Sequence, residues 1–214
     1  MELLSALIDL FLHLDRHLVT LFADHGNWIY AILFLIVFCE TGLVVTPFLP
    51  GDSLLFTAGA LTAGAGMDAS LLIGVLYLAA VLGDSLNYTI GRRFGGRISQ
   101  WPDSRFFSRS ALERTHAFYE RHGGKTIVIA RFMPIVRTFA PFVAGMATMD
   151  YRRFLAFNLA GAALWVAPLV MAGHWFGNLP AVRSNLTLVI LGIIALSLLP
   201  LLIGWLRHRN RAAG

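Results

Sequence analysis

The stretch RFMPIVRTFAPFVAGM, residues 131–146, decides the fold because it places two arginines and two prolines in apolar sequence. Arg131 and Arg137 would each cost about 2.5–3.5 kcal/mol at the centre of a bilayer on insertion scales. Pro134 and Pro141 each lack the backbone N–H that a helix interior uses. We therefore expect a broken helix whose irregular part faces protein or water. A charge kept inside a membrane at this cost indicates a functional site.

The composition is that of an integral membrane protein. The chain has 214 residues, 57% hydrophobic and 14% charged, with uncharged runs long enough to cross a bilayer. Lys and Arg total 17 against 12 Asp and Glu, an excess that we assign to cytoplasmic loops because no nucleic-acid motif accompanies it. His116 and His122 lack further metal ligands, and no nucleophile elbow or zincin motif occurs. We expect no enzyme, no metal, no cofactor and no nucleic-acid partner.

The hydrophobic pattern predicts an all-helical chain in three parts. Residues 1–27 form an amphipathic or membrane helix, because polar residues recur along one face of residues 3–22, and both placements stay open. Glu2 and Asp9 stand where a removable signal peptide would be basic, so none is expected. Residues 28–177 form the membrane domain. Residues 178–214 form a last span, over 185–206, and a basic tail.

The membrane domain combines two broken segments with two spans. Trp28–Gly66 is predicted to be two short helices in a re-entrant hairpin, because Pro47 and Pro50-Gly51 interrupt it. Residues 126–149 form the second such hairpin. The predicted spans are residues 69–91 and 154–177. Between them, a capping box at Ser110–Glu113 and a stop at Gly123-Gly124 bound a short amphipathic helix.

The basic residues fix the predicted topology. Residues 92–125, 152–153 and 207–211 hold thirteen of the seventeen Lys and Arg, so all three segments, and the C-terminus, are expected in the cytoplasm. Residues 126–149 must then leave and return on one side of the membrane. The first hairpin opens from the outer face and the second from the inner face.

A short internal repeat links the two hairpins. Phe48-Leu-Pro50 precedes Ala58-Gly59, and Phe132-Met-Pro134 precedes Ala144-Gly145. A span ending in G-x-x-F-G follows each, at Gly91 and at Gly173. With opposite orientations, the two copies form an inverted repeat of the kind that places a binding site at mid-membrane.

Meeting hairpin tips would bring Glu40 and Asp52 close to Arg131 and Arg137. Two arginines can clamp a phosphate bidentately, and protonation of an acid can balance the added charge. Helix N-termini at Asp52 and after Pro134 can donate N–H groups to the same anion. Further candidates for lining the cavity are Asp84, Asn87, Tyr88, Pro50, Gly51, Pro134 and Pro141.

Structural alternatives apply to the same residues. The four charges can be a buried ion-pair cluster that only joins the hairpins, with Asp52 as an N-cap. Asp84, Asn87 and Tyr88 can form a polar patch near the cytoplasmic interface. Asn158, inside an uncharged span, is expected to make a helix–helix hydrogen bond.

The chain resembles the DedA family in the runs FCETGLVVTPFLPGDSLLFTAGAL, GDSLNYTIGRRFG, HGGKTIVIARFMPIVRTFAPFVAGM and FNLAGAALW, which cover about residues 28–177. The resemblance implies a multi-pass bacterial inner-membrane protein with two opposed re-entrant loops, distantly related to eukaryotic lipid scramblases. It implies proton-motive-force-linked recycling of undecaprenyl phosphate or transport of another lipid. The family's functional acids fall on Glu40 and Asp52, and its arginines on Arg131 and Arg137.

Three functions follow as alternatives. The first is a proton-linked flippase of a polyprenyl phosphate, whose partners are the anionic lipid, protons and the bilayer. The second is an energy-independent scramblase of ordinary phospholipids, and the third is a non-transporting assembly factor with a structural charge cluster. The sequence leaves the lipid and self-association into a homo-oligomer open.

Overall fold

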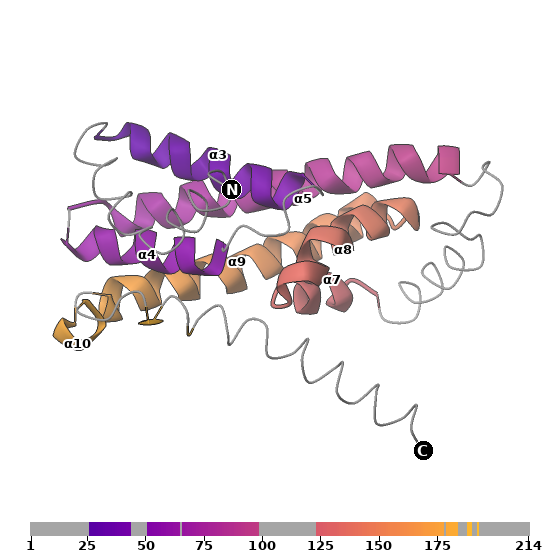
Figure 1. Ribbon diagram of the computed structural model, residues 1–214. Helices are drawn as coiled ribbons and strands as arrows, with labels where there is room; N and C mark the ends of the chain where they lie inside the picture. The colour runs from indigo at the N-terminus through magenta and orange to yellow at the C-terminus, as the bar shows by residue number, and fades with distance from the viewer. Residues whose placement is uncertain are drawn as a thin grey trace, which may run out of the picture. The chain divides into compact units, whose positions relative to one another are not determined.

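The computed structural model describes residues 26–43, 51–64, 66–98, 123–177 and 179–183, with single positions at 188, 189 and 192. Every regular element in these ranges is a helix, as predicted (Figure 1). The helices are α3 (Trp28–Gly42), α4 (Gly51–Gly64), α5 (Ala69–Ile98), α7 (Lys125–Ala130), α8 (Pro134–Met146), α9 (Tyr151–Phe176) and α10 (Pro180–Arg183). Four predictions lie outside the described residues: the helix at 3–22, the break at Pro47 and Pro50, the capping box at Ser110–Glu113, and, apart from its three single positions, the span at 185–206.

Two of the described helices are long and apolar enough to cross a membrane. The qualifying segments are Ala69–Phe94 of α5 and Tyr151–Phe176 of α9, each 26 residues long. These are the two spans predicted between 69 and 177. Leucines on their outward faces, such as Leu78 and Leu164, are about half exposed, as expected of side chains that face lipid. Helix α5 continues past its predicted end to Ile98.

The predicted break near Arg131 is present. Helix α7 ends at Ala130, and Arg131 to Met133 form a turn. Met133 is extended, at φ −119° and ψ 104°, as a residue before proline prefers. Pro134 then begins α8. A backbone N–H at this position would have no acceptor within the helix, so the proline costs no hydrogen bond. The irregular backbone therefore places Arg131 at the junction of two short helices.

Two expectations about proline and aspartate differ from the structure. Pro141 lies inside α8 and does not end it, because the helix continues across the single hydrogen bond that a proline removes. Asp52 is not the N-cap of α4, which already begins at Gly51. Asp52 instead lies in the first helical turn, where the positive end of the helix dipole stabilises a negative charge.

The chain divides into two compact units. Unit 1 comprises Met1–Phe34, Pro50–Leu76 and Val166–Gly214, and unit 2 comprises Leu35–Leu49 and Tyr77–Trp165. Helices α3, α5 and α9 each contribute one part to each unit. The first predicted hairpin is divided between the units, with α4 in unit 1 and residues 35–49 in unit 2. The second hairpin, which comprises α7 and α8, belongs wholly to unit 2.

Glycines allow the closest helix packing inside unit 1. A Cβ on Gly59 of α4 would collide with the backbone carbonyl of Val170 on α9. A Cβ on Gly173 of α9 would in turn collide with the carbonyl of Phe56 on α4. The two helices thus meet backbone to backbone through a reciprocal pair of glycines, which only residues without a side chain permit.

The same reciprocal arrangement occurs inside unit 2. Gly145 of α8 packs on the carbonyl of Tyr88 in α5, and Gly91 of α5 packs on the carbonyl of Phe142 in α8. The spacing is the same in both units. Each glycine lies three residues after the residue whose carbonyl contacts the partner glycine. Gly59 and Gly145 occupy equivalent positions in the internal repeat predicted from the sequence. Gly173 and Gly91 are a second equivalent pair. This equivalence supports an internal repeat, and the opposite orientation of its copies in a membrane stays a prediction.

An aromatic and aliphatic core holds the broken segment in unit 2. Tyr88 stacks on Phe154 with ring centroids 4.5 Å apart, and its hydroxyl donates to the carbonyl of Met149. Ile127 of α7 and Ala144 of α8 belong to the same buried cluster. Helices α5, α7, α8 and α9 therefore share one core, from which the turn at Arg131 is positioned.

Candidate functional site

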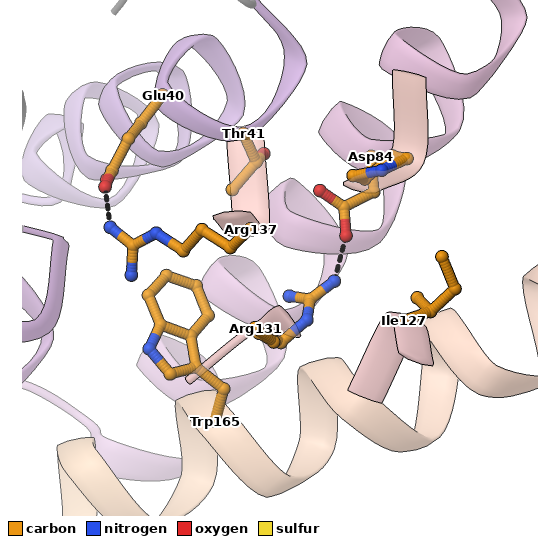
Figure 2. A pocket seen from close by; sticks show the side chains of 8 residues that line it. Glu40, Thr41, Asp84, Ile127, Arg131, Arg137 and Trp165 are labelled. Atoms are coloured by element: carbon orange, nitrogen blue, oxygen red, sulfur yellow. Dashed lines mark hydrogen bonds and ion pairs between the residues drawn. The ribbon is translucent and has the colours of Figure 1, made fainter. Parts of the chain in front are cut away.

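Four buried charged side chains line one small cavity in unit 2. Glu40 comes from α3, Asp84 from α5, Arg131 from the turn after α7, and Arg137 from the first turns of α8 (Figure 2). Three separate helices and one break are thus needed to assemble the site. The full lining is Glu40, Thr41, Asp84, Ile127, Arg131, Arg137, Pro141 and Trp165.

The charges form two ion pairs. Arg137 donates through Nη2 to Oε1 of Glu40, and Arg131 donates through Nη2 to Oδ2 of Asp84. All four side chains are at most 9% exposed, so the pairs are shielded from solvent. Two acids balance two bases, which a low-dielectric site requires. Removing one partner from such a pair typically costs about 3–5 kcal/mol, because the other charge stays buried.

Arg131 has a second hydrogen-bond partner on α9. Its Nη2 donates to Oδ1 of Asn158 over 2.6 Å, and Asn158 itself donates through Nδ2 to the carbonyl of Val81 over 3.1 Å. Gly161, one helical turn further along α9, leaves room for the arginine, since a Cβ there would lie 3.3 Å from Arg131 Nε. Helix α9 thus orients the guanidinium towards Asp84.

Asn87 fixes the two helices that carry the other pair. Its Nδ2 donates to the carbonyl of Thr41 over 3.1 Å and to the carbonyl of Thr138 over 2.7 Å. Thr41 follows Glu40 in the chain, and Thr138 follows Arg137. Asn87, fully buried, therefore ties together the backbone segments that present these two charges.

Trp165 of α9 completes the cavity beside both arginines. Its ring centroid lies 4.9 Å from Cζ of Arg137 and 5.7 Å from Cζ of Arg131. Sequence reasoning did not single out Trp165, and it assigned Asn158 only a helix–helix hydrogen bond. One signal was available, because Asn158, Gly161 and Trp165 follow one another at steps of three and four and so share one helix face.

The structure brings some predicted site residues together and not others. Glu40, Asp84, Arg131, Arg137 and Pro141 line the cavity. Asn87 and Tyr88 are buried in unit 2 but are not part of the lining, and neither they nor Asp84 form a surface patch. Asp52 and Gly51 belong to unit 1, so the expected approach of Asp52 to the arginines stays a prediction. Pro50 lies outside the described residues, and the side chain of Pro134 is not described.

Asp84 therefore has a larger part in the site than the sequence indicated. From the sequence we expected Glu40 and Asp52 beside the arginines and Asp84 only as a candidate for lining the cavity. In the structure, Asp84 is an ionic partner of Arg131. Helix α5 decides this, because it places Asp84 one turn before Asn87 and directly beside the broken helix.

The cavity around these charges is small. It offers about 10 Å³ to the centre of a water molecule, which is room for about one water. A phosphate group cannot enter this arrangement unless at least one ion pair opens. The carboxylates of Glu40 and Asp84 each contact Nη2 of an arginine, a donor that an anionic ligand would also use.

The sequence matches known proteins over its full length. The VTT domain model matches residues 49–175. Protein DedA of Escherichia coli strain K12 is 57% identical over 215 residues, which cover 100% of this chain and 98% of that protein. This chain belongs to the DedA family. An uncharacterized membrane protein of Mycobacterium leprae is 45% identical over 83% of the chain and 80% of its own length.

Membership of the DedA family agrees with the two apolar spans. Inner membrane protein YghB of Escherichia coli strain K12 is another relative, 34% identical over 80% of this chain and 75% of that protein. The VTT match contains Asp84, both arginines and Trp165, whereas Glu40 precedes it. No solved structure matches the chain.

Proposed function

We propose that this DedA-family chain is a lipid transporter of the bacterial inner membrane. In this proposal, the phosphate of an anionic lipid replaces carboxylates on Arg131 and Arg137, and proton uptake balances the charge. The observation that carries the proposal is the pair of buried arginine–carboxylate contacts around one cavity. Intramembrane charges mark substrate or proton pathways more often than inert contacts.

The chemistry of the exchange follows from charge balance. An arginine fork fits either a carboxylate or a phosphate, so the two anions compete for the same N–H edges. An arriving phosphate adds one or two negative charges to a balanced site. Each protonation, of Glu40 or of Asp84, removes one of these charges and weakens the hold of that carboxylate on its arginine. We retain Asp52 as a further proton partner on the family resemblance.

The substrate and topology are parts of the proposal that come from the resemblance and the sequence. The lipid is undecaprenyl phosphate or a similar polyprenyl phosphate. The chain crosses the membrane several times, has two re-entrant hairpins in an inverted repeat, and ends in the cytoplasm. Relatives named as inner membrane proteins support the location. The equivalent glycine pairs in units 1 and 2 support the repeat.

A structural role for the charges is the second candidate. Both arginines are paired, and the cavity holds about one water, as expected of a cluster that only joins helices. A non-transporting assembly factor would need nothing more from these residues. Transport and its dependence on protons separate the two functions.

Reconstitution in liposomes tests the proposal. Purified protein is inserted into vesicles that contain labelled undecaprenyl phosphate, and movement of the label between leaflets is followed with and without a proton gradient. The proposal predicts transport that responds to the gradient. Transport indifferent to the gradient would indicate an energy-independent scramblase. No transport above protein-free vesicles would favour the assembly factor.

A further inference from the structure

Trp165 contacts both cations of the site. Its ring centroid lies 4.9 Å from Cζ of Arg137 and 5.7 Å from Cζ of Arg131, within the range in which an aromatic ring attracts a guanidinium. Figure 2 shows the indole beside both side chains. The residue is 2% exposed, so little water weakens the attraction. One neutral ring is thus a shared partner of two buried arginines.

An aromatic partner leaves the binding edges of an arginine available. A ring attracts the cation as a whole and takes up none of its N–H groups, which point outward at the edges of the guanidinium plane. Both arginines indeed donate through Nη2 to a carboxylate while they lie against Trp165. The ring neither titrates nor competes for these donors. It can therefore keep its contacts when a carboxylate is protonated or displaced.

We propose that Trp165 is a positioning residue that holds the two guanidinium groups together while their carboxylates exchange for lipid phosphate. This inference rests on the proposed function, since it assigns Trp165 a role in the same exchange. Without the ring, an arginine released by Glu40 or Asp84 has lost a fixed neighbour. The two cations would then meet one phosphate in the required arrangement less often.

A role in packing alone makes a different prediction. If Trp165 only fills space on α9, an apolar side chain of smaller size should reduce stability without a specific effect on lipid affinity. If its ring positions the arginines, Trp165→Phe should rescue what Trp165→Leu loses. Trp175→Leu is the matched control, because Trp175 lies on the same helix but is 63% exposed.

The experiment measures initial transport rates in proteoliposomes against the concentration of a short-chain polyprenyl phosphate. We expect Trp165→Leu to raise the apparent KM about tenfold, with a smaller effect on the maximal rate, and Trp165→Phe to stay within about threefold of the wild type. Trp175→Leu should behave as the wild type. Thermal unfolding in detergent confirms that each compared variant is folded.

Several results would overturn the inference. An unchanged KM in folded Trp165→Leu, or a Trp165→Phe variant as defective as Trp165→Leu, would each contradict a role for the ring. If Trp165→Leu does not fold, Trp165→Met replaces it, and an unchanged KM there carries the same meaning. If the wild type transports the lipid and these variants have the same KM, only the inference about Trp165 is contradicted. A wild type that does not transport contradicts the proposed function as well.

Discussion

At the scale of single residues, the proposal depends on the shape of Arg137 as well as on its charge. Arg137→Lys keeps a cation beside Glu40 but loses the planar fork that binds a phosphate bidentately. We expect a folded protein whose transport falls about tenfold or more, since a hydrogen bond to a charged group contributes about 1.5–3 kcal/mol. The measurement is the initial rate in liposomes at matched protein content. Transport near the wild-type rate would remove Arg137 from the mechanism.

Asp84 provides a second prediction at this scale, and it concerns stability. Asp84→Asn leaves Arg131 buried beside a neutral group, so the free energy of unfolding should fall by roughly 3–5 kcal/mol and protein abundance should drop. Replacing both partners, as Asp84→Asn with Arg131→Gln, should recover part of that loss. Thermal unfolding of the two variants in detergent measures the difference. Equal stability of the single variant and the wild type would contradict the buried ion pair.

At the scale of elements, the reciprocal glycines predict which helix contacts tolerate a methyl group. Gly145→Ala places a Cβ against the backbone of α5 at Tyr88 and Arg92, and neither group can move without shifting the helix. We expect lower abundance and a lower unfolding temperature. Gly74→Ala is the control, because a Cβ at Gly74 meets nothing within 4 Å. It should be neutral or stabilising by about 0.5–1 kcal/mol. Similar behaviour of both variants would contradict the close packing of α8 on α5.

The helices were largely predictable because their signals are local. The length of the apolar runs indicated the spans in α5 and α9. Pro134, with an arginine on either side, indicated the break before α8. Errors arose where a neighbour overrides a local preference. Pro141 lies within α8 because packing holds the helix across it. Arg92 and Arg93 indicated a loop, yet α5 continues to Ile98.

The site was less predictable because pairing is decided by tertiary contacts. Arg131, Arg137 and Glu40 stood out as charges in or beside apolar sequence. Which acid faces Arg131 depends on how α5 packs, so the sequence could not select Asp84. Trp165 was missed because an aromatic residue on a span usually packs against lipid or other helices.

At the scale of the whole molecule, the basic residues predict a definite topology. With Cys39 replaced by Ala, single cysteines near Gly95 and near Arg153 should both be protected from a membrane-impermeant thiol reagent added outside intact cells. Mass shifts or loss of later labelling measure the protection. A cysteine placed in an outward-facing loop is the control. Outside labelling of only one of the two positions would rule out a re-entrant loop over residues 126–149, and labelling of both would contradict the predicted topology.

The exchange of carboxylate for phosphate on Arg137 is tested most directly by the proton dependence of transport in Glu40→Gln. This variant resembles a permanently protonated acid, so it should admit the lipid without taking up a proton at this position. We predict that wild-type transport of undecaprenyl phosphate in liposomes responds to a proton gradient, whereas folded Glu40→Gln at matched protein content does not respond. An equal response in both proteins would contradict proton uptake at Glu40 and the exchange on Arg137.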